Sequence, residues 1–202
     1  MKIHFKGIYK GKEDELDYLD EYCETEHKPN AVKLPELKVS NIKIHIFSII
    51  IVVCFCYIYN LRYNLITSYN DFINFIFVFA FFTILDIFLV PVHEILHTVF
   101  NKQDSYIFIQ PKQMYAVVIN YEEKSKRIRI LGLLFPNLIL GIIPFVVSLI
   151  FPQLKFLGMI AIPNITGGVG DFILILHYLH HVPNGAKIYN HKDDGSFWYI
   201  SE

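Results

Sequence analysis

The chain has 202 residues, of which 53% are hydrophobic and 18% charged, and its formal net charge is −1. Soluble domains average roughly 45 to 50% apolar residues even when glycine is counted, with about a quarter charged. This composition therefore excludes an ordinary soluble domain and indicates a membrane protein. The near-neutral charge balance also excludes a basic nucleic-acid-binding protein, and three cysteines are too few for a disulfide scaffold.

The apolar residues fall into four segments, each long enough to cross a bilayer core of about 30 Å at about 1.5 Å per helical residue. We therefore predict a mainly α-helical, polytopic integral membrane protein with four transmembrane helices. The predicted spans cover about 42–60, 72–100, 128–151 and 156–181. They make up a membrane domain over 42–182, which follows an N-terminal segment over 1–41 and precedes a tail over 183–202.

The basic residues predict how the chain is oriented. Of the 18 Lys and Arg residues, 16 lie before or at the start of span one (up to Lys43), between spans two and three or at the start of span three (Lys102 to Arg129), or in the tail. Only Arg62 and Lys155 lie in the other connections. Cytoplasmic loops carry the excess of Lys and Arg. We therefore expect a multi-pass protein of the cell membrane with both termini in the cytoplasm and the lipid bilayer as a constant partner.

The segment between spans two and three has a β pattern. Two β-branched and aromatic runs, Tyr106–Ile109 and Tyr115–Tyr121, flank the turn sequence Gln110-Pro111-Lys112-Gln113. This pattern predicts a small β-hairpin on the cytoplasmic side. The basic cluster from Lys124 to Arg129 follows at the start of span three, where we expect it to anchor the helix to anionic lipid.

The inner part of span two contains the sequence His93-Glu94-Ile95-Leu96-His97. Four residues make just over one helical turn, so His93 and His97 share a face and can offer two imidazole nitrogens to one zinc ion. Glu94 lies about 100° round the helix, where it can accept a proton from an attacking water. Ionisable side chains inside a span are costly and are typically functional. The motif therefore predicts zinc-dependent hydrolysis.

A catalytic zinc normally has three protein ligands and one open position. Asp171 is the only acidic residue in span four, and the glycines just before it allow close approach to a neighbouring helix. Counting residues from the inner ends of the two spans also places Asp171 and His93 at similar depths. Three later histidines stay open as alternative ligands, namely His177, His180 and His181. Asn164 is a candidate for contact with the substrate.

The His-Glu-Ile-Leu-His sequence in one span, with Gly-Val-Gly-Asp171 two spans later, resembles the bacterial membrane-bound zincin peptidase family, formerly a domain of unknown function. The resemblance covers roughly Ala80 to the tail. More distantly, the chain is similar to the site-2 class of intramembrane metalloproteases. The resemblance implies that His93, His97 and Asp171 bind zinc and that Glu94 is the general base. The chain departs from the site-2 pattern around the aspartate, where glycines replace the expected prolines.

Two functions are consistent with these features. The first is a membrane-embedded zinc metallopeptidase that cleaves a protein or peptide substrate in or near the cytoplasmic half of the membrane. The alternative is a non-catalytic zinc-binding membrane protein or small transporter, in which the polar cluster binds metal structurally or lines an ion path. Glu94 distinguishes the two functions, because a structural zinc site does not need a base.

Overall fold

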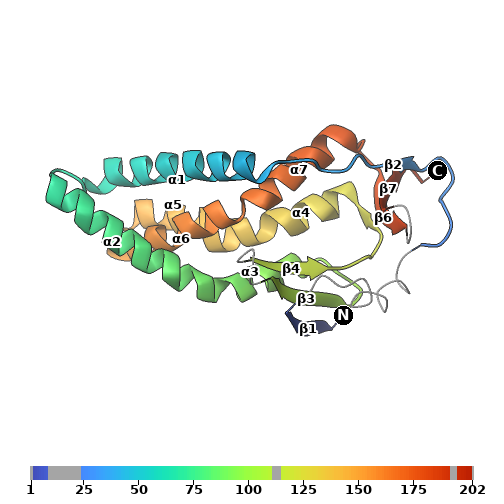
Figure 1. The fold of residues 1–202 in the computed structure, drawn as a ribbon, viewed down its shortest axis with the longest axis horizontal. Helices are drawn as coiled ribbons and strands as arrows, with labels where there is room; N and C mark the ends of the chain where they lie inside the picture. Colours follow the sequence, from blue (N-terminus) through green and yellow to red (C-terminus); the bar gives the residue numbers. More distant parts are fainter. Residues whose placement is uncertain (1, 9–23, 111–114, 192–194, 202) are drawn as a thin grey trace. The chain divides into compact units, whose positions relative to one another are not determined.

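The computed structural model describes residues 2–8, 24–110, 115–191 and 195–201. The protein is mainly helical and has two small sheets (Figure 1). It forms two compact units whose segments alternate along the chain. The helical unit consists of Lys38–His93 and Phe135–Ile173, and the sheet unit consists of Met1–Leu37, Glu94–Leu134 and Leu174–Glu202. The predicted division into an N-terminal segment, a membrane domain and a tail describes which residues lie in the membrane. The two compact units do not test that division, and it stays a prediction.

Several helices are apolar and long enough to cross a membrane. Among the described residues these are Ile42–Tyr63, Tyr69–His97 and Lys126–Ile150, each with very few charges. Phe156–Gly167 and Val169–His181 form a further pair, bent by 51°, which can count as one broken span. The mainly helical architecture therefore agrees with the sequence, and among the described residues three helices, or up to four if the bent pair is one span, are long and apolar enough to cross a membrane.

The second of these stretches is built from three pieces. Helix α2 (Tyr69–Asp86) begins after Ser68, whose hydroxyl accepts a hydrogen bond from the Asp71 amide at 3.2 Å. A short 3-10 turn, η3 (Ile87–Leu89), then leads into α3 (Val90–His97). The tightened turn comes just before Pro91, which cannot donate a helical hydrogen bond. The two histidines of the motif therefore lie on a short helix of their own.

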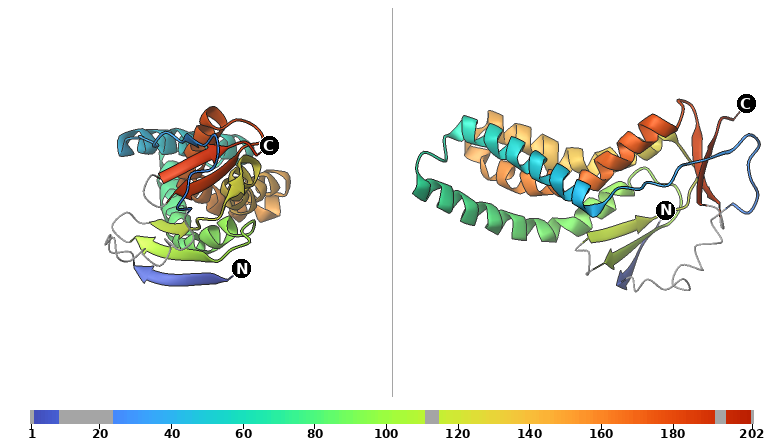
Figure 2. Two further views of the ribbon diagram at one scale, coloured as in Figure 1. Left: turned by 90° about the vertical axis from the view of Figure 1, so that its right-hand side faces the viewer. Right: turned by 45° about the horizontal axis from the view of Figure 1, so that its top comes forward.

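Helix α6 is the centre of the helical unit. It packs against α1, α2, α5 and the π-helix η4, and Figures 1 and 2 show α5 and α6 side by side. The bounds are α1 Asn41–Tyr63, η4 Asn137–Ile142, α5 Ile143–Ile150 and α6 Phe156–Gly167. The core of the helical unit contains Tyr59, Phe145, Met159, Ile162 and Ile165. A short 3-10 turn, η5 (Pro152–Leu154), joins α5 to α6.

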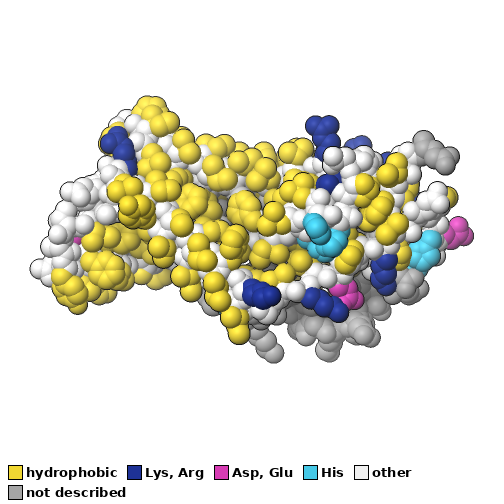
Figure 3. Space-filling view, turned by 90° about the horizontal axis from the view of Figure 1, so that it is seen from above, with side chains coloured by type: hydrophobic (Ala, Val, Ile, Leu, Met, Phe, Trp, Pro, Cys, Tyr) yellow, Lys and Arg dark blue, Asp and Glu magenta, His cyan; other side chains and the backbone are white. Residues whose placement is uncertain are grey.

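The outer faces of these helices are apolar and uncovered. Helix α2 has no buried residue, and large side chains on α2 and η3 are widely exposed, as in Phe77 at 70% and Phe88 at 74%. Figure 3 shows one face of the protein on which hydrophobic side chains predominate over the helices. Since exposing apolar surface to water costs about 25 cal/mol per Å², these faces need lipid or another apolar partner.

The first sheet lies in the sheet unit and has the order β1-β3-β4. Strand β1 (Ile3–Ile8) pairs parallel to β3 (Ser105–Gln110), and β3 pairs antiparallel to β4 (Tyr115–Ile119). The β3–β4 pairing matches the strands of the expected hairpin, and residues 111–113 of its predicted turn lie outside the described residues. Its position relative to the membrane stays a prediction.

A second sheet has the order β2-β7-β6-β5, with antiparallel pairing throughout. The strands are β2 Val32–Lys33, β5 Lys124–Ser125, β6 Lys187–His191 and β7 Gly195–Tyr199. Leu34, Val182, Ala186 and Ile188 form a small core beside it. The segment expected to be a simple tail therefore contributes two strands to the sheet unit.

The basic cluster does not serve mainly as a lipid anchor. Lys126, at the start of α4 (Lys126–Pro136), is buried, and its ammonium donates to the Val182 carbonyl at 2.5 Å, just past the end of α7 (Val169–His181). Arg129 donates to the Glu122 carbonyl at 3.2 Å, and the Lys124 side chain is only 8% exposed. The expected contact with anionic lipid is therefore wrong for these three residues. Their charged groups instead interact with backbone carbonyls and with the Glu122 carboxylate.

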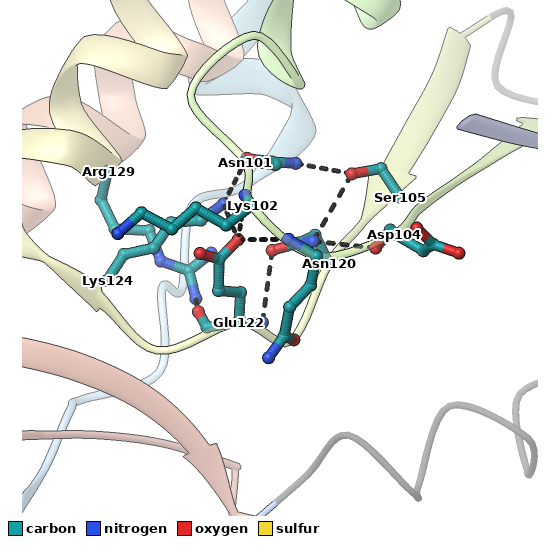
Figure 4. A network of polar contacts seen from close by, with 9 residues as sticks. Asn101, Lys102, Asp104, Ser105, Asn120, Glu122, Lys124 and Arg129 are labelled. Atoms are coloured by element: carbon teal, nitrogen blue, oxygen red, sulfur yellow. Dashed lines mark hydrogen bonds and ion pairs between the residues drawn. The ribbon is translucent and has the colours of Figure 1, made fainter. Parts of the chain in front are cut away.

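Glu122 organises the loop that follows α3 (Figure 4). Its carboxylate accepts hydrogen bonds from the backbone amides of Lys102 at 2.8 Å and Gln103 at 3.3 Å, and lies 4.0 Å from the Lys124 ammonium. Lys124 also donates to the Asn101 side chain. Burial of Lys124 lowers the pKa of its ammonium to about 8, and the nearby Arg129 acts in the same direction. Charged groups therefore tie the loop to the strand that returns from β4.

Candidate metal centre

His93 and Asp171, which both belong to the helical unit, lie close together. His93 lies on α3 and is 9% exposed, and Asp171 lies in the first turn of α7. The His93 Nε2 atom is 3.2 Å from Asp171 Oδ2. With zinc–ligand bonds of about 2.0 to 2.1 Å, tetrahedral zinc holds two ligand atoms about 3.3 Å apart. The separation, which also fits a direct hydrogen bond or ion pair, is compatible with a shared zinc ion.

His97 follows His93 by one turn on the same helix. The ligand atoms of His93, His97 and Asp171 all lie within 4.8 Å of one another. The His97 Nδ1 atom is 2.8 Å from the Gly132 carbonyl oxygen, which can only accept a hydrogen bond. Nδ1 therefore carries the hydrogen, and Nε2 keeps its lone pair for a metal.

Two imidazoles and one carboxylate form a donor set of the kind found in catalytic zinc sites. Within the part of the chain that the structure describes, no other group of three or more His, Cys, Asp or Glu side chains meets the same distance limit. The structure thus brings Asp171 to the histidine pair and leaves out the alternative ligands His177, His180 and His181. The residues present fit zinc.

The far side of His93 faces a buried polar chain. Its Nδ1 atom is 3.4 Å from Asn164 Oδ1, and Asn164 Nδ2 donates to Asp86 Oδ1 at 3.4 Å. Because a carboxylate only accepts hydrogen bonds, Asp86 sets which end of the Asn164 amide faces His93. The amide oxygen then favours a hydrogen on His93 Nδ1, which leaves Nε2 for the metal. Asn164, expected to contact substrate, is 3% exposed and holds this position between the two residues.

Asn137 was not among the residues selected from the sequence. It is completely buried at the start of η4, and its side-chain amide donates to Asp171 Oδ2 at 2.8 Å. The sequence held one signal, a polar residue directly after Pro136 inside an apolar span. Such a residue needs a buried partner, but the sequence does not show which one.

Of the three glycines before Asp171, only Gly168, at the bend between α6 and α7, lies where a side chain would collide with a neighbour. A Cβ atom at Gly168 would collide with Asn137 Oδ1, whereas a Cβ at Gly167 or Gly170 would meet nothing within 4 Å. The Gly168 carbonyl also accepts the Asp171 amide at 3.0 Å, which starts the first turn of α7. Gly168 therefore allows Asn137 to approach the chain just where Asp171 is positioned.

Glu94 is partly buried and follows His93 directly on α3. At about 100° per residue it lies to the side of the face that carries the two histidines. A carboxylate in that position is suited to accept a proton beside the metal instead of binding the metal itself. The role of Glu94 as general base stays a prediction.

The sequence model of a family described as "Putative zincin peptidase" matches residues 86–187, just over half of the chain. The chain belongs to this family. The matched segment includes the two histidines, Glu94 and Asp171, together with Asp86, Asn137 and Asn164 around them. No curated protein and no solved structure matches the chain. The family description agrees with the donor set in pointing to zinc.

Proposed function

We propose that the protein is a membrane-embedded zinc metallopeptidase that hydrolyses peptide bonds in or near the cytoplasmic half of the membrane. The observation that carries the proposal is the convergence of His93, His97 and Asp171, with Glu94 next to the first histidine. Helices apolar enough to span a membrane and the zincin family support the same function. The excess of basic residues in three segments supports a cytoplasmic position for both termini.

The chemistry divides between the metal and the protein. When bound, zinc would polarise a substrate carbonyl and lower the pKa of a bound water from about 15.7 to about 7. Glu94 would accept the proton of the attacking water and then give it to the departing amine nitrogen, so that it returns to its starting state.

The buried amides would keep the ligands in position. Asn164, itself held by Asp86, supports His93, while Asn137 supports Asp171 and the Gly132 carbonyl supports His97. We therefore assign Asn164 and Asn137 as positioning residues. Outer partners of this kind typically contribute about 10- to 100-fold to metal affinity or activity.

The first sheet supports a proposal about the substrate class. A peptide must be extended before a backbone carbonyl can reach a buried metal, and an edge strand can hold it extended by backbone hydrogen bonds. In the order β1-β3-β4, strand β4 pairs on one side only among the described strands. We propose that a protein or peptide substrate, including a membrane-bound one, pairs with this edge.

The function is tested with Glu94→Gln, which keeps the size of the side chain and removes the base. Purified Glu94→Gln protein should hold as much zinc as wild type, and cells that express it should lose the cleavage products seen by proteomics with wild type. The control Glu123→Gln replaces a glutamate that pairs with Lys187 at 3.1 Å, outside the metal centre, and should retain cleavage. Identical product profiles for wild type and Glu94→Gln would refute the peptidase and favour a non-catalytic zinc protein or transporter.

A further inference from the structure

A second group of histidines lies at the other end of α7 from Asp171. His177, His180 and His181 occupy its last two turns. His177 and His181 are four residues apart, the same spacing as the two histidines of the metal centre, and so share a face of the helix. Their ring centroids are 4.6 Å apart, and the ring planes are inclined by 52°.

This spacing is close to that of two imidazoles on one metal ion. With zinc–nitrogen bonds of about 2.0 to 2.1 Å and tetrahedral angles, two bound imidazole rings have centroids about 5 Å apart. A small rotation about the side-chain bonds of His177 and His181 would bring one nitrogen of each ring to a common ion. His180 precedes His181 directly, and its ring meets the His181 ring edge-on at 4.6 Å.

The nitrogens of these rings are not used by the fold. Among the residues that the structure describes, none forms a hydrogen bond or ion pair with the side chain of His177, His180 or His181. His180 is exposed and the other two are partly exposed, so solvent can reach the cluster. Paired imidazoles with unused nitrogens contrast with the histidines of the catalytic centre, each of which has a protein partner on its second nitrogen.

We propose that His177 and His181 form a second metal site, which takes a borderline divalent transition ion such as Zn²⁺ or Cu²⁺, with water completing the coordination. Neutral imidazole is a preferred ligand of both ions, and a site of this kind favours Cu²⁺ over Zn²⁺ at equal concentration. Two protein ligands bind more weakly than three, so the site fills after the catalytic centre. A bound ion would cross-link the last turn of α7 and stabilise that end of the helix.

The test uses the purified full-length protein in detergent, stripped of metal by a chelator and titrated calorimetrically with Zn²⁺. Wild type should bind two equivalents in two steps. His177→Ala/His181→Ala should lose the weaker step and keep the tighter one, while His180→Ala, in the same turn, should keep both. His93→Ala/His97→Ala should lose the tighter step and keep the weaker one, which separates this site from the proposed catalytic function.

A spectroscopic measurement tests the ligands of the second site directly. Because Cu²⁺ binds imidazole more tightly than Zn²⁺ and would compete for the first site as well, the protein used carries His93→Ala and His97→Ala. One equivalent of Cu²⁺ is added to this protein, and its electron paramagnetic resonance spectrum should show coupling to two imidazole nitrogens. Adding His181→Ala should reduce this to one nitrogen or none. A weaker calorimetric step that survives in His177→Ala/His181→Ala, or a copper spectrum that His181→Ala leaves unchanged, would mean adventitious binding only and overturn the proposal.

Discussion

The Asn137 side-chain amide donates a hydrogen bond of 2.8 Å to Asp171 Oδ2, the same oxygen that faces His93 Nε2. Asn137 begins a π-helix directly after Pro136, and irregular turns of this kind are frequent at functional sites. The position of Asp171, the proposed third ligand, thus depends on a residue from a different apolar segment. Metal binding should therefore respond to changes at Asn137 although the residue is not itself a ligand.

Replacing Asn137 with leucine should lower zinc affinity by about 10- to 100-fold, because Asp171 loses the donor that fixes its carboxylate. Competition with a chromophoric chelator measures this affinity. Asn74→Leu, an exposed asparagine on α2, is the matched control and should leave the affinity unchanged. Equal affinities for wild type and Asn137→Leu would show that Asp171 holds its position without this hydrogen bond.

The glycines before Asp171 allow a sharper comparison. Gly168→Ala should weaken zinc binding to a similar degree, because the new Cβ must displace the Asn137 side chain or change the bend. Gly167→Ala and Gly170→Ala place a Cβ in open space, and alanine is favoured over glycine in helices by about 1 kcal/mol. These two variants should bind zinc normally and melt no lower than wild type. The same loss of affinity in all three would contradict a specific contact with Asn137.

The sequence was sufficient for the parts of the site that depend on local geometry. Helical periodicity alone places His93 and His97 on one face, and the low number of acidic residues in the later spans points to Asp171. Asn137 and Asp86 could not be assigned in this way, because a polar residue in an apolar span indicates a buried partner without identifying it. Their partners come from residues 34 and 78 positions away along the chain.

The fold shows a similar limit. Long apolar runs predict spanning helices because burial in lipid needs length and hydrophobicity alone. The sequence analysis does not predict the tail strands β6 and β7, although Lys187–His191 and Gly195–Tyr199 flank the polar sequence Lys-Asp-Asp. The pairing of β6 with β5 joins parts of the chain about sixty residues apart, and no local pattern specifies such a pairing.

Lys126 should be important for stability, whereas its neighbour Arg127 should not. The Lys126 ammonium is buried and donates to the Val182 carbonyl at 2.5 Å and to the Asn184 side chain at 3.3 Å. Lys126→Ala leaves these acceptors without their donor, which costs about 1.5 to 3 kcal/mol for hydrogen bonds to a charged group. Arg127 is exposed, and Arg127→Ala should change stability by less than about 0.5 kcal/mol. Thermal melting in detergent compares the two, and similar melting temperatures would refute a structural role for Lys126.

The lowered pKa of Lys124 predicts that the folded protein becomes more stable at alkaline pH. Its pKa is lowered to about 8 in the folded protein, first by burial and then by Arg129, against an ordinary value of 10.5. Between pH 8 and pH 10.5 the unfolded chain therefore holds a proton that the folded chain has released. Stability rises with pH wherever the unfolded state binds more protons. Below this window both states are charged and the cost of burying the ammonium is fully present.

Lys124→Met removes this titration and should flatten the dependence of the melting temperature on pH between about 7.5 and 9.5, relative to wild type. Lys187→Met is the control, because hydrogen bonding to Glu123 raises the pKa of Lys187, so this residue remains charged in both states throughout that window. Its profile should therefore rise as wild type does. An equal rise in melting temperature for Lys124→Met and wild type over this pH range would show that burial of the Lys124 ammonium does not destabilise the folded protein.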